Sequence, residues 1–257
     1  MDHPLYTPIL NALLTQHKLP VSPSWLSTFV STTQQPAPPL VALTSTARFR
    51  ILVSDIKTCL SQDEHAPSLP ADINNVSVKE LRLSRDVVVQ VLDIVDVGVS
   101  KWSQVEAMER VERGEEVRGR EVIRTVANLD DGGAGSDGLA AAQGPSTTAS
   151  ATAAARSVGP HKLILQDARG VNVTAFEQVA LPQLFIGEGG VSIGCKLLLQ
   201  AGTLVRRGMV MMTPDKVVVM GGKVESWDRK WRELLKERLV KDVDKQIGNR
   251  AGDRSTE

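Results

Sequence analysis

Short apolar runs separated by turn residues recur through the second half of the chain. The runs are His161–Gln166, Val171–Val179, Lys196–Gln200, Leu204–Met212 and Lys216–Met220. Strands of this length, with turn signals about every 8–12 residues, are typical of an all-β barrel or sandwich. The apolar stretch Asp86–Val97 supplies one more strand. That strand would complete a small barrel, and the residues between it and His161 would then be an insertion.

The first part of the chain has helical periodicity instead. Apolar residues at intervals of three and four predict a helix over Pro4–His17. Ser22 and Pro23 are typical of a helix start, with an N-cap serine followed by proline at the first helical position. A third, longer helix is predicted from the stripe Phe49, Leu52, Val53, Ile56 and Leu60. We expect the three helices to bury their stripes against one another and against the barrel.

Two more helices are predicted on either side of the barrel strands. The first covers Ser100–Gly114, where Trp102 and Val105 belong to an apolar set at helical spacing. The second begins near Ser226 and is predicted to end at Gly248, followed by a polar tail. Its apolar face consists of Trp227, Trp231, Leu234, Leu235 and Val243.

The stretch Asn128–Gly159 consists mainly of Gly, Ala, Ser and Thr. Such a composition cannot bury a core, so we predict disorder over about residues 128–159. Long structureless segments inside a compact domain are usually functional loops or linkers. A neutral low-complexity expansion is the other interpretation, and the sequence leaves both open.

Composition limits the classes of function. Thirty basic and thirty acidic residues give a net charge of zero, so no bulk electrostatic field draws the protein to nucleic acid. The two cysteines are far apart in sequence, which is typical neither of a disulfide framework nor of a zinc cluster and fits a reducing compartment. The chain shows neither a secretory signal nor an apolar run of the roughly 18–20 residues that span a membrane.

Candidate catalytic features fail on detail. The glycine-rich segment Gly187–Lys196 lacks the Gly-Lys-Ser/Thr ending of a phosphate loop and the third glycine of a dinucleotide fingerprint, so we interpret it as an inter-strand loop. The four histidines have no metal-ligand spacing. Asp93 and Asp96 are expected on opposite faces of a strand, where they make a poor acid–base pair. We therefore expect no enzyme activity, no cofactor and no metal.

The barrel has one basic cluster, formed by Arg206 and Arg207 with Lys196 and Lys216 beside them. Barrels of this kind often bind single strands through a basic groove and stacking aromatics. Aromatic residues are scarce here, at 4% of the chain. A surface charge cluster or a protein-contact patch is the competing interpretation.

Five segments, in order, carry a resemblance to a known family. They are Val95–Val97 followed by Trp102–Gln104, then Leu163–Gly170, Lys196–Leu199, Arg206 with Gly208 and the apolar run after it, and Thr213–Val224. Together they resemble the OB-fold of the RecQ-mediated genome instability protein 1 family, in its short, fungal-type form. The N-terminal helices are similar to the helical domain that this family carries.

The resemblance implies an α+β organisation. We expect an N-terminal helical domain over residues 1–70 and an OB-fold barrel over 71–224. The barrel would carry an insertion at about 98–160 between its first two strands. A C-terminal helix over 225–247 and a disordered tail over 248–257 would complete the chain.

The resemblance also implies a function. Members of the family are non-catalytic nuclear subunits that bind topoisomerase III and act with a RecQ-type helicase in double Holliday junction dissolution and decatenation. Their insertion modulates the topoisomerase gate. The alternative is a stand-alone single-stranded-DNA-binding protein with an OB-fold. Neither function involves a membrane.

Residues carried over by position are the candidate contacts. Those for the topoisomerase are Val99, Ser100, Lys101, Trp102 and Val105 at the root of the insertion, with Lys196 and Arg206 on the barrel. Arg206, Arg207 and Lys216 are candidate DNA contacts. Trp102 is the strongest anchor candidate, because aromatic residues dominate binding energy at interfaces; its packing back onto the barrel is the alternative.

Overall fold

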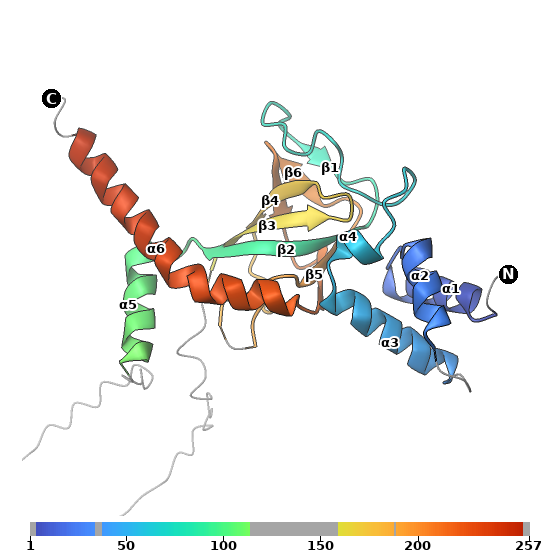
Figure 1. Ribbon diagram of the computed structural model, residues 1–257. Helices are drawn as coiled ribbons and strands as arrows, with labels where there is room; N and C mark the ends of the chain where they lie inside the picture. The colour runs from blue at the N-terminus through green and yellow to red at the C-terminus, as the bar shows by residue number, and fades with distance from the viewer. Residues whose placement is uncertain (1–3, 34–37, 114–158, 188, 254–257) are drawn as a thin grey trace, which may run out of the picture.

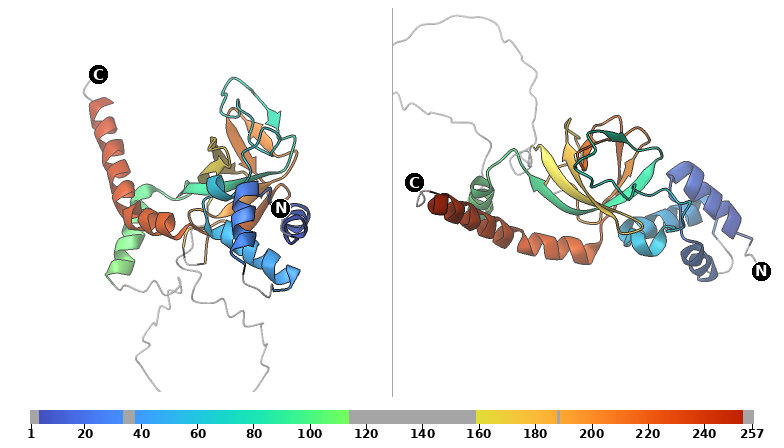
Figure 2. Two further views of the ribbon diagram at one scale, coloured as in Figure 1. Left: turned by 45° about the vertical axis from the view of Figure 1, so that its right-hand side comes forward. Right: turned by 90° about the horizontal axis from the view of Figure 1, so that it is seen from above.

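The structure is a computed structural model that describes residues 4–33, 38–113, 159–187 and 189–253. A group of short helices lies on one side of a curled β-sheet, and a long C-terminal helix extends from the other side (Figures 1 and 2). The low-complexity stretch lies outside the described residues up to 158, so its disorder stays a prediction.

Four helices form the N-terminal group. The first two confirm the sequence prediction, with Ser22 and Pro23 at the start of the second. The helices are α1 (Tyr6–His17), α2 (Pro23–Ser31), α3 (Leu40–Val53) and α4 (Ile56–Cys59).

The prediction of one long third helix was wrong. Helix α3 begins at Leu40 and buries Leu43, Ala47 and Ile51, whereas Phe49 is 65% exposed. The chain then leaves the helix because Ser54 is extended, and Asp55 starts α4 by accepting a 3.0 Å hydrogen bond from the backbone N–H of Lys57. The predicted stripe therefore joined two helices with different buried faces.

The sheet confirms the predicted OB-type barrel, in the form of a curled half-barrel. In spatial order the strands are β1-β6-β7-β4-β3-β2-β5-β8, and all neighbours are antiparallel except β4 and β7. The strands are β1 (Leu81–Arg82), β2 (Val87–Asp96), β3 (His161–Asp167), β4 (Asn172–Glu177), β5 (Lys196–Leu199), β6 (Leu204–Arg206), β7 (Met209–Met212) and β8 (Val217–Gly221).

One predicted strand is in fact a hairpin. The run Leu204–Met212 folds back on itself, so that Arg206 pairs with Met209. Arg207 and Gly208, with φ of 47° and 79°, form the turn. Two consecutive positive φ angles are the signature of a tight two-residue hairpin turn. Arg207 therefore lies at a turn and not within a strand.

Two apolar cores share the central strands. Val87, Val89 and Val91 of β2 point into the barrel, whereas Val88 of β2 and Leu198 of β5 join the core of the N-terminal helices. Because both faces are covered here, Val87–Val89 of β2 and Leu197–Leu199 of β5 are apolar at every position and do not alternate.

Two helices flank the barrel as predicted. Helix α5 (Lys101–Glu112) follows β2, and α6 (Glu225–Asp253) follows β8 and lies beside α5 (Figure 1). The predicted end of the C-terminal helix at Gly248 was wrong, because α6 continues to Asp253. One glycine in a helix costs only about 1 kcal/mol relative to alanine, which does not suffice to end it.

Lys196 joins the barrel to the helical end. Its side chain is fully buried, and its ammonium donates 2.6 Å hydrogen bonds to the backbone oxygens of Ser54 and Gly194. Burial lowers the pKa of Lys196 from 10.5 to about 8. The carbonyl of Ser54 is available for this bond because the chain leaves α3 at that residue.

We expect Lys196→Met to lower the free energy of unfolding by about 1–3 kcal/mol near pH 7, because two buried carbonyls lose their donor. Between about pH 8 and 10.5 the unfolded state binds more protons at Lys196 than the folded state does. Wild-type stability relative to the variant should therefore rise across this range. Urea unfolding at several pH values measures the difference.

Lys162→Met, at an exposed position on β3, is the matched control and should change stability little at any pH. A gap between wild type and Lys196→Met that stays constant or shrinks with rising pH would contradict this account of Lys196.

Candidate partner-binding surface

The chain leaves the barrel at the end of β2 through a tightly held turn. The Asp96 carboxylate accepts hydrogen bonds from the backbone N–H groups of Gly98 and Val99, at 2.8 and 3.2 Å. Gly98 must be glycine because a Cβ atom there would lie 2.1 Å from the carbonyl oxygen of Gly159. The two ends of the insertion therefore touch at this point.

Two further contacts hold the ends of the insertion together. The backbone N–H of Val97 donates to the Pro160 oxygen at 2.9 Å. The buried Glu177 carboxylate accepts from the backbone N–H groups of His161 and Leu181, at 2.9 and 2.7 Å, and lies 2.6 Å from Nδ1 of His161. Hydrogen bonds to the barrel thus fix the residues at which the insertion starts and ends.

Helix α5 is attached to α6 by ion pairs. The Lys101 ammonium lies 2.6 Å from the Asp242 carboxylate and, through its hydrogen bond, lowers the pKa of that carboxyl group. At the other end of α5, Lys236 lies 2.6 Å from Glu112, which raises the pKa of the lysine. These pairs set the direction in which the helix leaves the barrel.

The predicted contacts at the root of the insertion divide into two kinds. Trp102 is 64% exposed and Val99 is 39% exposed, so both are available to a partner, and Trp102 does not pack back onto the barrel. The other three have local roles. Ser100 accepts a 3.1 Å hydrogen bond from the backbone N–H of Ser103 at the start of α5, Lys101 pairs with α6, and Val105 is buried.

The predicted barrel contacts do not share a surface with the root. Lys196 is buried, which corrects its assignment as a surface contact. Arg206 is exposed and lies 3.4 Å from Glu80. Strand β6 and its turn lie on the opposite part of the sheet from α5 (Figures 1 and 2), so Arg206 and Arg207 cannot contact the same small surface as Trp102.

The predicted basic cluster is also broken up. Arg207 lies in the β6–β7 turn and Lys216 is half-buried before β8, where its ammonium extends toward Gly202. With Lys196 inside the protein and Arg206 beside Glu80, the four residues do not form one basic groove.

The glycine-rich loop contributes to the barrel core and to the contact between the barrel and α6. Val191 and Ile193 are buried in the barrel core, and the backbone N–H of Ile193 donates to the Asp228 carboxylate of α6 at 2.9 Å. Within the described residues, no three His, Cys, Asp or Glu side chains are grouped as metal ligands would be. Among the same residues no helix has the length and apolar character to cross a membrane.

Sequence reasoning missed the polar contacts that fix these elements. Asp96 and Glu177, both buried, hold the ends of the insertion, and Asp93 accepts from Trp231 of α6. The only signal in the sequence was an acidic residue inside or beside an apolar strand. Its partner lies many residues away, so the pairing could not be read from spacing.

Two sequence models of known domains match the chain. The model described as "RMI1, N-terminal helical domain" matches residues 13–59, and the one described as "RMI1, N-terminal OB-fold domain" matches residues 69–235. RecQ-mediated genome instability protein 1 of Schizosaccharomyces pombe is 26% identical over 195 residues, which cover 75% of this chain and 76% of that protein.

The exposure of Trp102 and the burial of Val105 predict opposite effects on stability. Trp102→Ala should change the free energy of unfolding by less than about 0.5 kcal/mol, as an exposed substitution does. Val105→Ala should loosen α5, raising amide hydrogen exchange across the helix about tenfold or more. Exchange measured residue by residue separates the two. Faster exchange in α5 of Trp102→Ala would show that the tryptophan is structural.

Proposed function

Because this chain belongs to the RecQ-mediated genome instability protein 1 (RMI1) family, which has a role in genome stability, we propose that it is a non-catalytic subunit that binds topoisomerase III. Together with a RecQ-type helicase it would promote dissolution of double Holliday junctions and decatenation of DNA in the nucleus. The observation that carries this proposal is the exposed Trp102 on α5, a helix that follows β2 and is attached to α6 by ion pairs.

The geometry suits an insertion that acts on a gate. A loop can bias opening or closing only if it binds one gate state better than the other. The unequal binding of the loop can act on the gate only if the ends of the loop are fixed to the barrel. A loop with mobile ends would move together with the gate. The contacts of Asp96, Gly98 and Glu177 at the ends of the insertion supply that anchor.

The same features argue against a stand-alone single-strand-binding protein. That function needs a continuous basic groove with stacking aromatics. Lys196 is buried, Arg206 lies beside Glu80, and Arg207 lies at a hairpin turn. These positions leave Arg206, Arg207 and Lys216 as contacts for a few phosphates at most, in support of the main interaction with the topoisomerase.

We expect Trp102→Ala to weaken binding to topoisomerase III by about 2 kcal/mol or more, a roughly 30-fold rise in Kd, because a buried aromatic anchor is lost from the complex. Isothermal titration calorimetry measures the change. Phe49→Ala is the matched control, since Phe49 is 65% exposed and belongs to α3, which lies apart from α5 (Figure 1). Equal affinities of Trp102→Ala and wild type would remove the root of the insertion from the interface.

Replacing residues 115–158 with a shorter Gly-Ser linker should separate binding from gate control. The barrel should stay folded, because Val97 and Pro160 close the insertion independently of its length. Topoisomerase binding should largely survive, while stimulation of decatenation of linked DNA circles should fall. Full stimulation by the shortened protein would place the gate contacts within the residues that remain, before residue 114.

A further inference from the structure

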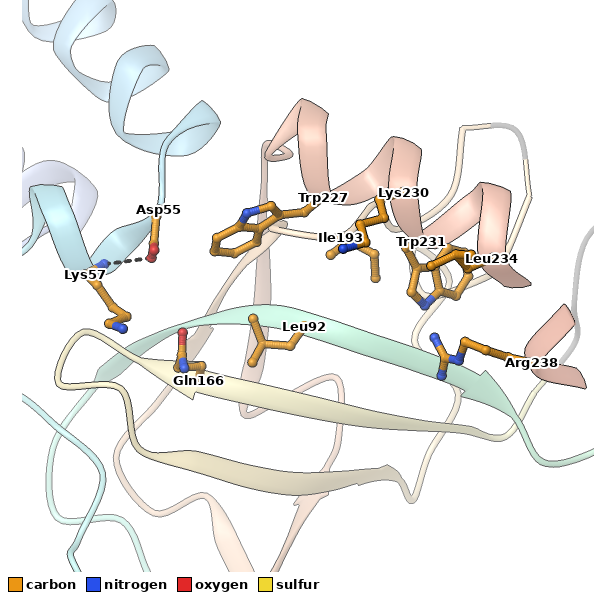
Figure 3. Close-up of a pocket in the computed structure, with 10 residues that line it drawn as sticks. All are labelled: Asp55, Lys57, Leu92, Gln166, Ile193, Trp227, Lys230, Trp231, Leu234 and Arg238. Atoms are coloured by element: carbon orange, nitrogen blue, oxygen red, sulfur yellow. Dashed lines mark hydrogen bonds between the residues drawn. The ribbon is translucent and has the colours of Figure 1, made fainter. Parts of the chain in front are cut away.

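A groove of about 470 Å³ lies on the outside of the barrel, away from the inner core (Figure 3). Leu92 of β2 and Gln166 of β3 form its floor, and Trp227, Trp231 and Leu234 of α6 form one wall. The groove lies between the helical end of the protein and the start of α6, so three parts of the chain contribute to it.

A β-bulge in β2 builds this groove. Val91 pairs with Leu165 and Asp93 pairs with Ile164, so Leu92 is an extra residue without a partner on β3. Val91 and Ile94 both belong to the barrel core, which leaves Leu92 and Asp93 in succession on the outside. Bulges often redirect side chains next to functional sites. Here the bulge presents Leu92 to the groove and Asp93 to α6.

Asp93 fixes the wall of the groove. Its carboxylate accepts a 2.7 Å hydrogen bond from Nε1 of Trp231 and lies 2.6 Å from the Arg238 guanidinium. Both side chains line the groove. Because charge-assisted hydrogen bonds of this length are strong, the groove is held open in a defined shape and is ready for a ligand.

The rim of the groove is basic. Lys57, Lys230 and Arg238 line it, together with a single acid, Asp55. The Asp55 carboxylate already accepts from the backbone N–H of Lys57 and from Gln90, at 3.0 and 2.8 Å. Within the described residues neither Lys57 nor Lys230 has an ion-pair partner. Arg238 is paired with Asp93 and Asp55 is a single negative charge, so the two lysines leave the rim with an excess of positive charge.

The walls favour protein over nucleic acid as the occupant. Bases stack on open aromatic faces, but Trp231 is only 8% exposed and Trp227 packs against the barrel core. Leu92 and Leu234 add aliphatic surface to the groove, and Leu234 is 39% exposed. Along the floor of the groove β2 is paired with β3, and β5 pairs with β2 only over Val87–Gln90. The lining consists of side chains from β2, β3, α6 and the helical end, so recognition runs through side chains, as with a helix in a groove.

We propose that this groove docks an acidic amphipathic helical segment of a partner protein, at a site separate from the root of the insertion. Large apolar side chains of the segment lie over Leu92 and Leu234, and its carboxylates face Lys57 and Lys230. The proposed groove site is independent of the topoisomerase interaction. If the groove binds no acidic segment, the proposal for topoisomerase binding still stands.

The test uses a fluorescent amphipathic peptide of about 14 residues, with leucines at positions i, i+3, i+4 and i+7, glutamates at the positions beside them and alanines elsewhere to favour a helix. A peptide with lysines in place of the glutamates and a labelled oligothymidine are compared with it. Fluorescence anisotropy should show binding of the acidic peptide alone. In an NMR titration, the indole signals of Trp227 and Trp231 should shift while those of Trp25 and Trp102 stay in place.

Charge reversal then tests the rim. The double variant Lys57→Glu/Lys230→Glu, at exposed positions, should weaken acidic-peptide binding about tenfold or more. Leu234→Ser should weaken it by removing an apolar side chain from the wall of the groove. Lys79→Glu, an exposed lysine before β1, should leave affinity unchanged. The double variant should still bind topoisomerase III as wild type does.

Four outcomes would overturn the proposal. Equal binding of the acidic and lysine peptides would remove the charge selectivity, and no binding of the acidic peptide would remove the site. Oligothymidine binding that is lost in the double variant would make the groove a nucleic-acid site. Loss of topoisomerase binding in the double variant would make the groove part of that interface and not a separate one.

Discussion

Strand β2 is the element on which the rest of the structure depends, because it pairs with two other strands and contributes to both apolar cores. It pairs with β3 along most of its length and with β5 at its start. Its inward residues form the barrel core, while Val88 joins the helical core and Gln90 accepts from the backbone N–H of Ile56 in α4. Its far end, at Asp96, starts the insertion. One strand thus fixes the helical end, the barrel and the insertion relative to one another.

The sequence predicted those parts of the fold whose signal is local. Apolar runs with turns and the buried residues Val105 of α5 and Trp231 of α6 reflect burial on one side of a single element, and the Ser22–Pro23 helix start reflects the backbone preferences of those two residues. Errors arose where a distant partner decided the outcome. Helix α3 ends at Val53 and α4 begins at Ile56, and the Ser54 carbonyl between them accepts from Lys196, 142 residues further along the chain. Periodicity contains no information about such a bond.

The candidate site was predictable to the same extent. The family resemblance pointed to the root of the insertion and to Trp102, which is exposed, because matching a motif identifies residues by their position in the sequence. It could not tell which side chains of that segment are used internally. Ser100 starts α5, Lys101 pairs with Asp242, and Lys196 is buried, each because of neighbours that spacing does not reveal. The β-bulge at Leu92 could not be predicted for a related reason. In the sequence, Leu92 and Asp93 fit the alternation of an ordinary strand, and only the pairing of β2 with β3 shows the extra residue.

Both proposed binding surfaces are held in shape by hydrogen bonds and ion pairs to carboxylates of the barrel. At the root, Asp96 and Glu177 accept backbone N–H groups from both ends of the insertion, so a force on α5 is passed to the barrel and not absorbed by a flexible turn. At the groove, Asp93 holds Trp231 and Arg238 in place. In each case a carboxylate on or next to the central strands orders the elements that a partner meets. Each binding surface is therefore ordered before it meets a partner, and less binding energy is lost to ordering on association. That arrangement suits a subunit whose proposed contribution lies in binding rather than chemistry.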